Sequence, residues 1–361
     1  MLSSLSAKNG LVLPQVHIHG WNEMRAKLAV MTRTVYKRCV SALLTSGVIL
    51  VGGGLVALSC GMRLPSFKSA DAAAVVKPKI VTSAAAPKTC TAQIQANPLF
   101  ASCPSFWVNY AGQTQGTANS SAFNVASGAP VSNSEAEYYT GNSNNLRIAN
   151  GSLVLEAQNQ ADHGYKYTSA RIDTHGKEDF LYGKLVIRAM LPDGIGTWPA
   201  IWMMPSQPKY ASLSPASDTN RYLNDGEMDI AESAGVQPHM VYGVAHSIAY
   251  PEGGPDNSYY STVTVPDNNT VFHDYELDWT PTSLTFSVDG KPFYTYTKQA
   301  GADWHSWPFN QPFYLIVDLA LGGTWAGNDR AQFPTDGVDK AALPASMQVQ
   351  SINYYSYVGA N

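Results

Sequence analysis

Charged side chains are scarce in this chain of 361 residues. Lys, Arg, Asp and Glu together make up 14% of the sequence, and the formal net charge is −4. Such a chain has no basic field to attract nucleic acid, so we expect no nucleic-acid partner. Phosphate-binding loops, Rossmann glycine fingerprints, zinc-type Cys/His spacings and Gly-x-Ser-x-Gly elbows are also missing. Nucleotide-dependent and serine-hydrolase chemistry therefore have little support.

Cysteine is rare as well, with four in the chain. Cys39 and Cys60 lie in an apolar N-terminal segment, and we expect them to stay unpaired. Cys90 and Cys103 stand thirteen positions apart on either side of a polar loop, which makes them candidates for a disulfide in an exported protein. The alternative is two unpaired thiols.

One long hydrophobic run is present, at residues 39–62. The run is uncharged and follows the basic residues Arg33, Lys37 and Arg38. This order is typical of an export signal or a membrane anchor. Its length suits a membrane span, whereas its three consecutive glycines weaken a helix. The segment is therefore either a signal that is cleaved off or an anchor that stays in the membrane. The basic residues predict that everything after this run is extracytoplasmic, either secreted or anchored to the membrane.

The rest of the chain divides by composition. Residues 1–38 are cytoplasmic, or they precede the true start of the protein. Residues 63–89 are rich in Ala, Ser, Val, Lys and Pro without periodicity, as in a flexible linker. Residues 90–361 then form one domain, which is long but normal for a large β-sandwich, and we expect it to be monomeric.

Short runs of β-branched and aromatic residues recur through this domain, bounded by Gly, Asn, Asp or Pro. Examples are residues 153–157, 183–189 and 284–293, and no convincing amphipathic helix interrupts them. The pattern predicts an all-β fold. We expect a two-sheet jelly-roll sandwich in which one sheet is concave.

Three carboxylates stand in an otherwise apolar segment, at Glu227, Asp229 and Glu232. Buried charges are costly unless they are paired or used, so this segment suggests an active site. Strand alternation places Glu227 and Asp229 on one face, and a β-bulge of one residue returns Glu232 to it. Two glutamates brought close in this way suit the nucleophile and the acid/base of a retaining glycosidase. The alternatives are a solvated strand face or a calcium site.

Glu-x-Asp-x-x-Glu after Gly226 resembles the signature of the family-sixteen glycoside hydrolases, in the bulged form of laminarinase-like endo-β-1,3-glucanases. Further segments, in the family's order, extend the resemblance from about residue 133 almost to the C-terminus: 133–140, 150–157, 167–172, 196–205, 272–279, 288–290 and 307–315. The resemblance implies that Glu227 is the nucleophile, that Glu232 is the acid/base and that Asp229 lies between them. It implies a polysaccharide substrate and no cofactor.

Three tryptophans are candidate substrate contacts, because aromatic rings offer flat apolar faces to sugars. Trp198 and Trp202 lie four positions apart, and we expect one of them to pack in the core unless their whole strand face lines the cleft. Trp325 follows a flexible Gly-Gly pair, where stacking on substrate and core packing are equally expected.

Polar candidates complete the predicted site. A simple antiparallel register places His246 roughly opposite Glu227 or Asp229, although a lone strand histidine is more often structural. The family resemblance supports a role for His246 at the site. It also implies that three residues which alone would be ordinary surface residues contact sugar hydroxyls or shape the cleft: Arg171, Asn133 and Glu135.

Two segments depart from the family pattern. Near the C-terminus, Gln350 replaces an aspartate that is often a structural calcium ligand, and a neutral amide is a poorer ligand for a hard cation. Residues 247–250 differ from the usual continuation after the histidine, so glycan specificity is left open.

The leading hypothesis is an endo-acting, retaining β-1,3-glucanase in the catalytic domain 90–361. The same residues also suit a β-1,3-1,4-glucanase, a galactanase or a transglycosylase. A non-catalytic glucan-binding protein is the alternative from another class, and the intact carboxylates disfavour it.

Overall fold

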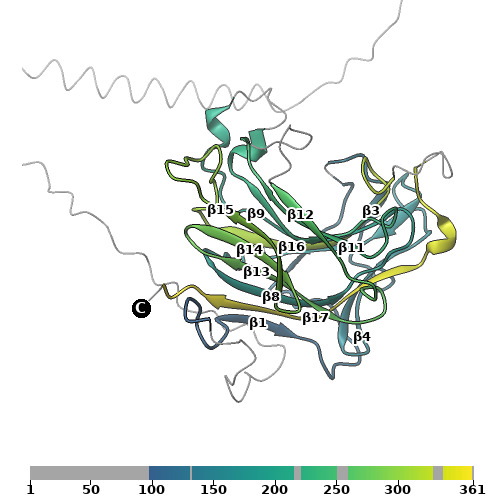
Figure 1. Cartoon of the computed structure of the whole chain (residues 1–361). Coiled ribbons are helices and arrows are strands. Elements are labelled where there is room, and N and C mark those ends of the chain that lie inside the picture. The colour runs from purple at the N-terminus through teal and green to yellow at the C-terminus, as the bar shows by residue number, and fades with distance from the viewer. Residues whose placement is uncertain (1–96, 131, 215–220, 250–258, 328–335, 360–361) are drawn as a thin grey trace, which may run out of the picture. The chain divides into compact units, whose positions relative to one another are not determined.

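This computed structural model describes residues 97–130, 132–214, 221–249, 259–327 and 336–359. These residues contain seventeen β-strands and three 3₁₀ helices, joined by turns and loops (Figure 1). The strands are Phe106–Asn109 (β1), Asn124–Val125 (β2), Glu137–Tyr139 (β3), Leu146–Ala149 (β4), Ser152–Ala157 (β5), Tyr167–Ser169 (β6), Arg171–Asp173 (β7), Gly183–Met190 (β8), Thr197–Pro205 (β9), Glu227–Glu232 (β10), Met240–His246 (β11), Tyr260–Thr264 (β12), His273–Trp279 (β13), Ser283–Val288 (β14), Lys291–Thr297 (β15), Phe313–Leu321 (β16) and Ala345–Ser356 (β17). The 3₁₀ helices are Ala211–Leu213 (η1), Arg221–Asn224 (η2) and Lys340–Ala342 (η3).

The N-terminal predictions fall outside these residues. The export segment 39–62, the linker 63–89 and Cys90 are not among the described residues, and Cys103 is disulfide-bonded. Within the described ranges, none of the helices has the length and apolar character needed to span a membrane.

Two large antiparallel sheets form the sandwich, which confirms the predicted all-β jelly-roll class. The eight-stranded sheet has the order β15-β14-β13-β8-β17-β5-β4, with β1 also paired to β17. The seven-stranded sheet has the order β12-β11-β10-β9-β16-β7-β2. In Figure 1, β8 and β17 lie in one layer and β11 and β12 in the other. A small parallel pair, β3 and β6, belongs to neither large sheet.

The hydrophobic core lies between the sheets and follows from strand alternation. Ile187 and Leu277 contribute to it from the eight-stranded sheet, and Ile201, Met203 and Val317 from the seven-stranded sheet. Each of these five residues is at most 1% exposed to solvent. Because alternate residues of a strand point to opposite faces, even-numbered residues of β9 and β16 face away from this core. That outer face carries the candidate site.

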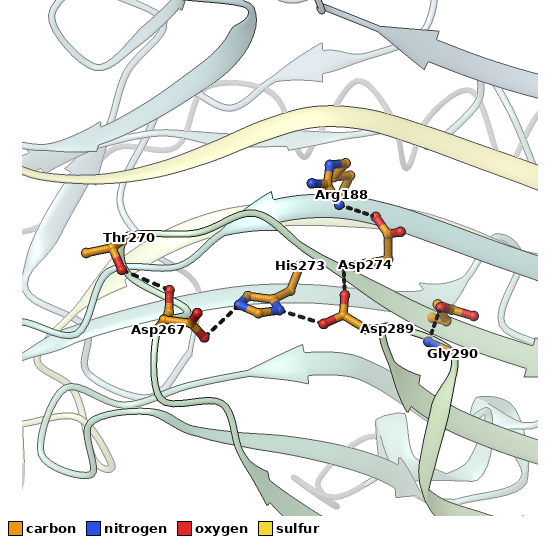
Figure 2. A network of polar contacts seen from close by, with 8 residues as sticks. Arg188, Asp267, Thr270, His273, Asp274, Asp289 and Gly290 are labelled. Carbon is orange, nitrogen blue, oxygen red and sulfur yellow. Dashed lines mark hydrogen bonds and ion pairs between the residues drawn. The ribbon is translucent and has the colours of Figure 1, made fainter. Parts of the chain in front are cut away.

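The run at residues 284–293 divides into two strands at Asp289 and Gly290. Both residues have positive φ, 51° and 72°, as the two-residue turns that match the twist of a hairpin require. The Asp289 carboxylate also pairs with His273 Nδ1 at 2.7 Å, while Asp267 lies 3.1 Å from Nε2 of the same ring (Figure 2). These contacts tie the hairpin turn to the start of β13.

Candidate active site

Strand β10 contains the predicted β-bulge. On its pairing with β11, Asp229 lies opposite Val244 and Glu232 opposite Tyr242, so three steps along β10 match two along β11. The register with β9 shifts at the same place, where Asp229 pairs with Trp202 and Glu232 with Ala200. One extra residue therefore returns Glu232 to the face that carries Glu227 and Asp229.

Gly226 fixes how the chain enters this strand. Its φ is +77°, and a Cβ at this position would lie 2.6 Å from the ring of Pro308. Residues other than glycine rarely adopt that backbone conformation, and at this position any side chain would also collide with the loop that carries Pro308. The glycine thus sets the direction of β10 immediately before Glu227.

Neighbouring strands hold the carboxyl groups. His246 lies directly opposite Glu227, as the simple register predicted, and its Nε2 is 3.0 Å from Asp229 Oδ2. On the other side of β10, Trp198 Nε1 donates a hydrogen bond of 2.9 Å to Glu232 Oε1. Asp229 is buried, whereas Glu227 and Glu232 are half-buried. The three acids are therefore gathered on one face, with the two glutamates nearer to solvent.

Burial and mutual repulsion shift the titration of both glutamates. Burial first, and then the charge of Asp229, raise the pKa of Glu227 to about 8, while His246 and Arg171 act in the opposite direction. The same two causes raise the pKa of Glu232 well above its usual range. Groups coupled in this way share protons instead of all ionising. This is the condition under which one glutamate is an acid while the other is a nucleophile.

The raised pKa of Glu227 makes the stability of the fold depend on pH. Between about 4.5 and about 8, the folded protein keeps a proton that the unfolded chain has lost, so the free energy of unfolding falls as pH rises through this window. Glu227→Gln removes this dependence because glutamine stays neutral. At about pH 8.5 we expect its Tm to exceed that of the wild type by roughly 4–8 °C, which corresponds to about 2 kcal/mol after allowance for partial exposure.

Thermal unfolding of both proteins at a series of pH values measures this difference. The gain in Tm should be near zero at about pH 4.5 and grow toward alkaline pH. A gain of the same size at both ends would show that Glu227 does not hold a proton in the folded state.

Both tryptophans of β9 lie on the outer face, so the expectation that one of them packs in the core is wrong. Trp198 and Trp202 are half-buried, and neither belongs to the core cluster, which takes Ile201 and Met203 from this strand. The reason is the alternation itself, because positions four apart in a strand share a face. Trp202 lies directly opposite Asp229 on this face, and the Trp198 indole contacts Glu232.

Trp325 is also close to the carboxylates. Its ring meets those of Trp198 and Tyr242 edge to face, at centroid distances of 5.2 and 5.0 Å. The loop that carries it is held by Asn133, whose carbonyl oxygen accepts a hydrogen bond of 2.9 Å from Thr324 N. Asn133 is exposed and Glu135 half-buried, and Glu135 forms a bridge with Gly322 in the same loop. Asn133 and Glu135 therefore support the loop of Trp325.

Arg171 reaches the site from β7. Its guanidinium carbon lies 4.9 Å from the centre of the Trp202 ring. In the sheet register, Arg171 lies opposite Asp318 on β16. Sequence reasoning missed Asp318, although an acid inside the apolar segment Phe313–Leu321 is the same signal that drew attention to β10. It also missed Tyr242, which lies opposite Glu232 because the bulge shifts the register of β10 and β11 by one residue.

One group of described residues can present a metal ion with three ligands. One ligand atom each of Glu227, Asp229 and His246 lies within 4.8 Å of the others, so a divalent cation there would compete with the acid and base roles. Gln350 is engaged with a cationic side chain of the protein. Its Oε1 accepts a hydrogen bond of 3.1 Å from Arg188 Nε. The Arg188 guanidinium, which already supplies a positive charge, also pairs with Asp274 at 3.1 Å (Figure 2).

Comparison with known proteins decides the family. The model of the glycosyl hydrolases family 16 matches residues 133–336. The chain belongs to glycosyl hydrolase family 16. As a glycoside hydrolase of this family, it is 38% identical over 237 residues to a β-glucanase of Rhodothermus marinus, a match that covers 63% of this chain and 76% of that protein.

Two further relatives place this family-16 hydrolase more closely. The solved structure of the laminarinase from Rhodothermus marinus matches with a TM-score of 0.61 and 35% identity, over 70% of this chain and 96% of that one. The glucan endo-1,3-β-glucosidase A1 of Niallia circulans is 32% identical over 242 residues, which cover 62% of this chain but only 32% of that longer protein. The predicted family membership is confirmed.

Proposed function

We propose that this family-16 hydrolase is an endo-acting, retaining β-glycanase that cleaves β-1,3-glucan. The observation that carries the proposal is the bulge in β10, which brings Glu227, Asp229 and Glu232 to one face of the sheet. A retaining glycosidase needs two carboxyl groups with different protonation states on opposite sides of the glycosidic bond. Burial and the charge of Asp229 raise the pKa of both glutamates, and the mechanism uses the state in which Glu227 has lost its proton and Glu232 has kept it.

In the first step, the Glu227 carboxylate attacks the anomeric carbon while Glu232 donates its proton to the departing glycosidic oxygen. The bond between that carbon and oxygen breaks, and the sugar is left as an ester of Glu227. In the second step, the Glu232 carboxylate removes a proton from water, and the water oxygen displaces Glu227. The hydrogen bond from Trp198 occupies Glu232 Oε1, which leaves Oε2 for the substrate.

Asp229 holds the two glutamates in place in this mechanism. It lies between them on the strand, and it pairs with His246, whose ring also lowers the pKa values of both glutamates. We propose that His246 limits the repulsion among the three acids. Arg171, the tryptophans Trp198, Trp202 and Trp325, and the loop held by Asn133 and Glu135 then bind the sugar chain.

The choice of β-1,3-glucan rests on the relatives, two of which are described as a laminarinase and a glucan endo-1,3-β-glucosidase. A polymer of this size cannot enter a cell, so we also propose that the enzyme is extracytoplasmic. Whether residues 39–62 are cleaved or keep it at the membrane is part of that proposal. Reducing-sugar release from laminarin, lichenan, agarose and carrageenan in parallel tests the substrate, and binding without release would favour a glucan-binding protein.

Stereochemistry tests the mechanism independently of the substrate. A double displacement inverts the anomeric carbon twice, so we expect the β-anomer to be released first. Proton NMR during the first minutes of hydrolysis, before mutarotation, distinguishes the two anomers. Early α-anomer would mean that a water molecule attacks directly, and it would remove the nucleophile role from Glu227.

A further inference from the structure

Asp318 is a buried carboxylate in the middle of β16. It is 4% exposed and lies within the apolar segment Phe313–Leu321, where a charge is costly unless it has partners. Its register partner on β9 is Ala200, which in turn lies opposite Glu232 on β10. Asp318 is thus two strands away from the proposed acid/base, on the same face of the sheet.

Three residues from three different strands converge on this carboxylate. Trp202 Nε1 donates a hydrogen bond of 2.6 Å to Oδ1, and the hydroxyl of Tyr139 donates one of 3.2 Å to Oδ2. Arg171 is its cross-strand partner on β7. The same Arg171 guanidinium packs over the Trp202 ring at 4.9 Å, so Asp318 holds the ring by a hydrogen bond and attracts the cation above it by charge.

This arrangement controls the plane of the Trp202 ring. An indole can rotate about two side-chain bonds, and a short charge-assisted hydrogen bond at its nitrogen selects one orientation. Trp202 lies directly opposite Asp229, so its ring forms part of the sheet face that carries the reacting groups. The orientation of this ring therefore decides how a sugar ring can lie against the site.

We propose that Asp318 is a positioning residue that orients Trp202 and Arg171 for the sugar bound next to the catalytic carboxylates. This inference deepens the proposed function and rests on it. Asp318 has no contact with the reacting atoms in this assignment, so its removal weakens sugar binding more than it slows the bond changes.

Two substitutions grade the effect. Asp318→Asn keeps an oxygen acceptor for Trp202 Nε1 but removes the charge that faces Arg171, whereas Asp318→Leu removes both. We expect KM to rise about threefold in Asp318→Asn and by about 10-fold or more in Asp318→Leu, with kcat changed by less than about threefold in each. The near-ultraviolet circular dichroism that Trp202→Phe removes should change in Asp318→Leu and persist in Asp318→Asn.

Asp173→Asn is the matched control. Asp173 lies on the same face, two residues from Arg171, but its carboxylate accepts hydrogen bonds from Asn124 and from the backbone of His175. We expect its KM to stay at the wild-type value. An equal rise in KM in Asp173→Asn would mean that any lost negative charge on this face has the same effect, and it would overturn the positioning role.

Binding measurements separate this inference from the proposed function. In a Glu232→Gln background, which does not turn over, calorimetry gives the affinity for an oligosaccharide of whichever glycan the wild type cleaves. A loss of affinity on adding Asp318→Asn supports the positioning role, and unchanged affinity refutes it, even if Asp318→Leu fails to fold. If the wild type cleaves none of the β-glucans, the proposed substrate is wrong irrespective of this result.

Discussion

Glu227→Gln and Glu232→Gln are each expected to abolish glucan hydrolysis while the sandwich still folds. Glutamine keeps the size and the hydrogen bonds of the side chain, but it can neither attack an anomeric carbon nor donate a carboxylic proton. Loss of the nucleophile should lower kcat on the order of 10⁵-fold, and loss of the acid/base by about 10²–10⁴-fold. Circular dichroism and initial rates on laminarin, measured on the same preparations, test both halves of this expectation.

Azide assigns the two roles. In Glu227→Ala the small anion can enter the space of the missing carboxylate and attack directly, which yields the α-glycosyl azide. In Glu232→Ala, with a substrate whose leaving group needs no acid, azide attacks the glycosyl ester of Glu227 and yields the β-product. If the two products appear in the opposite variants, the nucleophile and the acid/base must be exchanged.

Asp229→Asn is the graded control for these variants. Asp229 supports the geometry and is paired with His246, but it forms no bond to substrate in the proposed mechanism. We therefore expect a smaller loss of kcat than in either glutamine variant. Full activity in Asp229→Asn would remove this residue from the site.

The parts of the site that are local in sequence could be predicted from the sequence. Three acids at Glu-x-Asp-x-x-Glu spacing demand a bulge if they are to share a face, and the structure has it between Asp229 and Glu232. His246 could be located for the same reason, because a short turn connects β10 to β11 and simple antiparallel pairing then fixes the register. Glu227 and His246 do form a cross-strand pair.

The parts that depend on sheet order could not be predicted. Asp318 meets Trp202 across 116 positions and Tyr139 across 179. The first contact requires that β16 pairs with β9, and the second that β3, which belongs to neither large sheet, lies beside β16. No local periodicity specifies either arrangement. The shared face of Trp198 and Trp202 needs no knowledge of sheet order, since strand alternation alone requires it.

Gly235 lies against the backbone of Gly194, a close contact that could not be predicted from the sequence. We expect its substitution to have a large effect on stability. A methyl group on Gly235 would overlap the backbone carbonyl of Gly194 and lie 3.0 Å from Thr197 Oγ1. That carbonyl cannot move freely, because it accepts hydrogen bonds from the backbone and hydroxyl of Thr197 at 2.8 and 2.7 Å. Gly235→Ala must therefore displace the turn that leads into β9.

We expect Gly235→Ala to cost about 3 kcal/mol or more and to lower Tm by roughly 6–12 °C. Gly290→Ala is the matched control, because Gly290 has a φ of +72° but a methyl group added to it would meet no atom within 4 Å. It should lose only about 1 kcal/mol, through backbone strain alone.

Activity well below both melting temperatures connects this contact to catalysis. Gly235 N donates a hydrogen bond of 2.9 Å to Thr197 O, immediately before the Trp198 that holds Glu232 Oε1. A shift of this turn moves the indole away from the acid/base, so Gly235→Ala should lower kcat whereas Gly290→Ala should not. If the two variants have equal Tm values and equal rates, close packing between the β10–β11 turn and the start of β9 does not constrain the site.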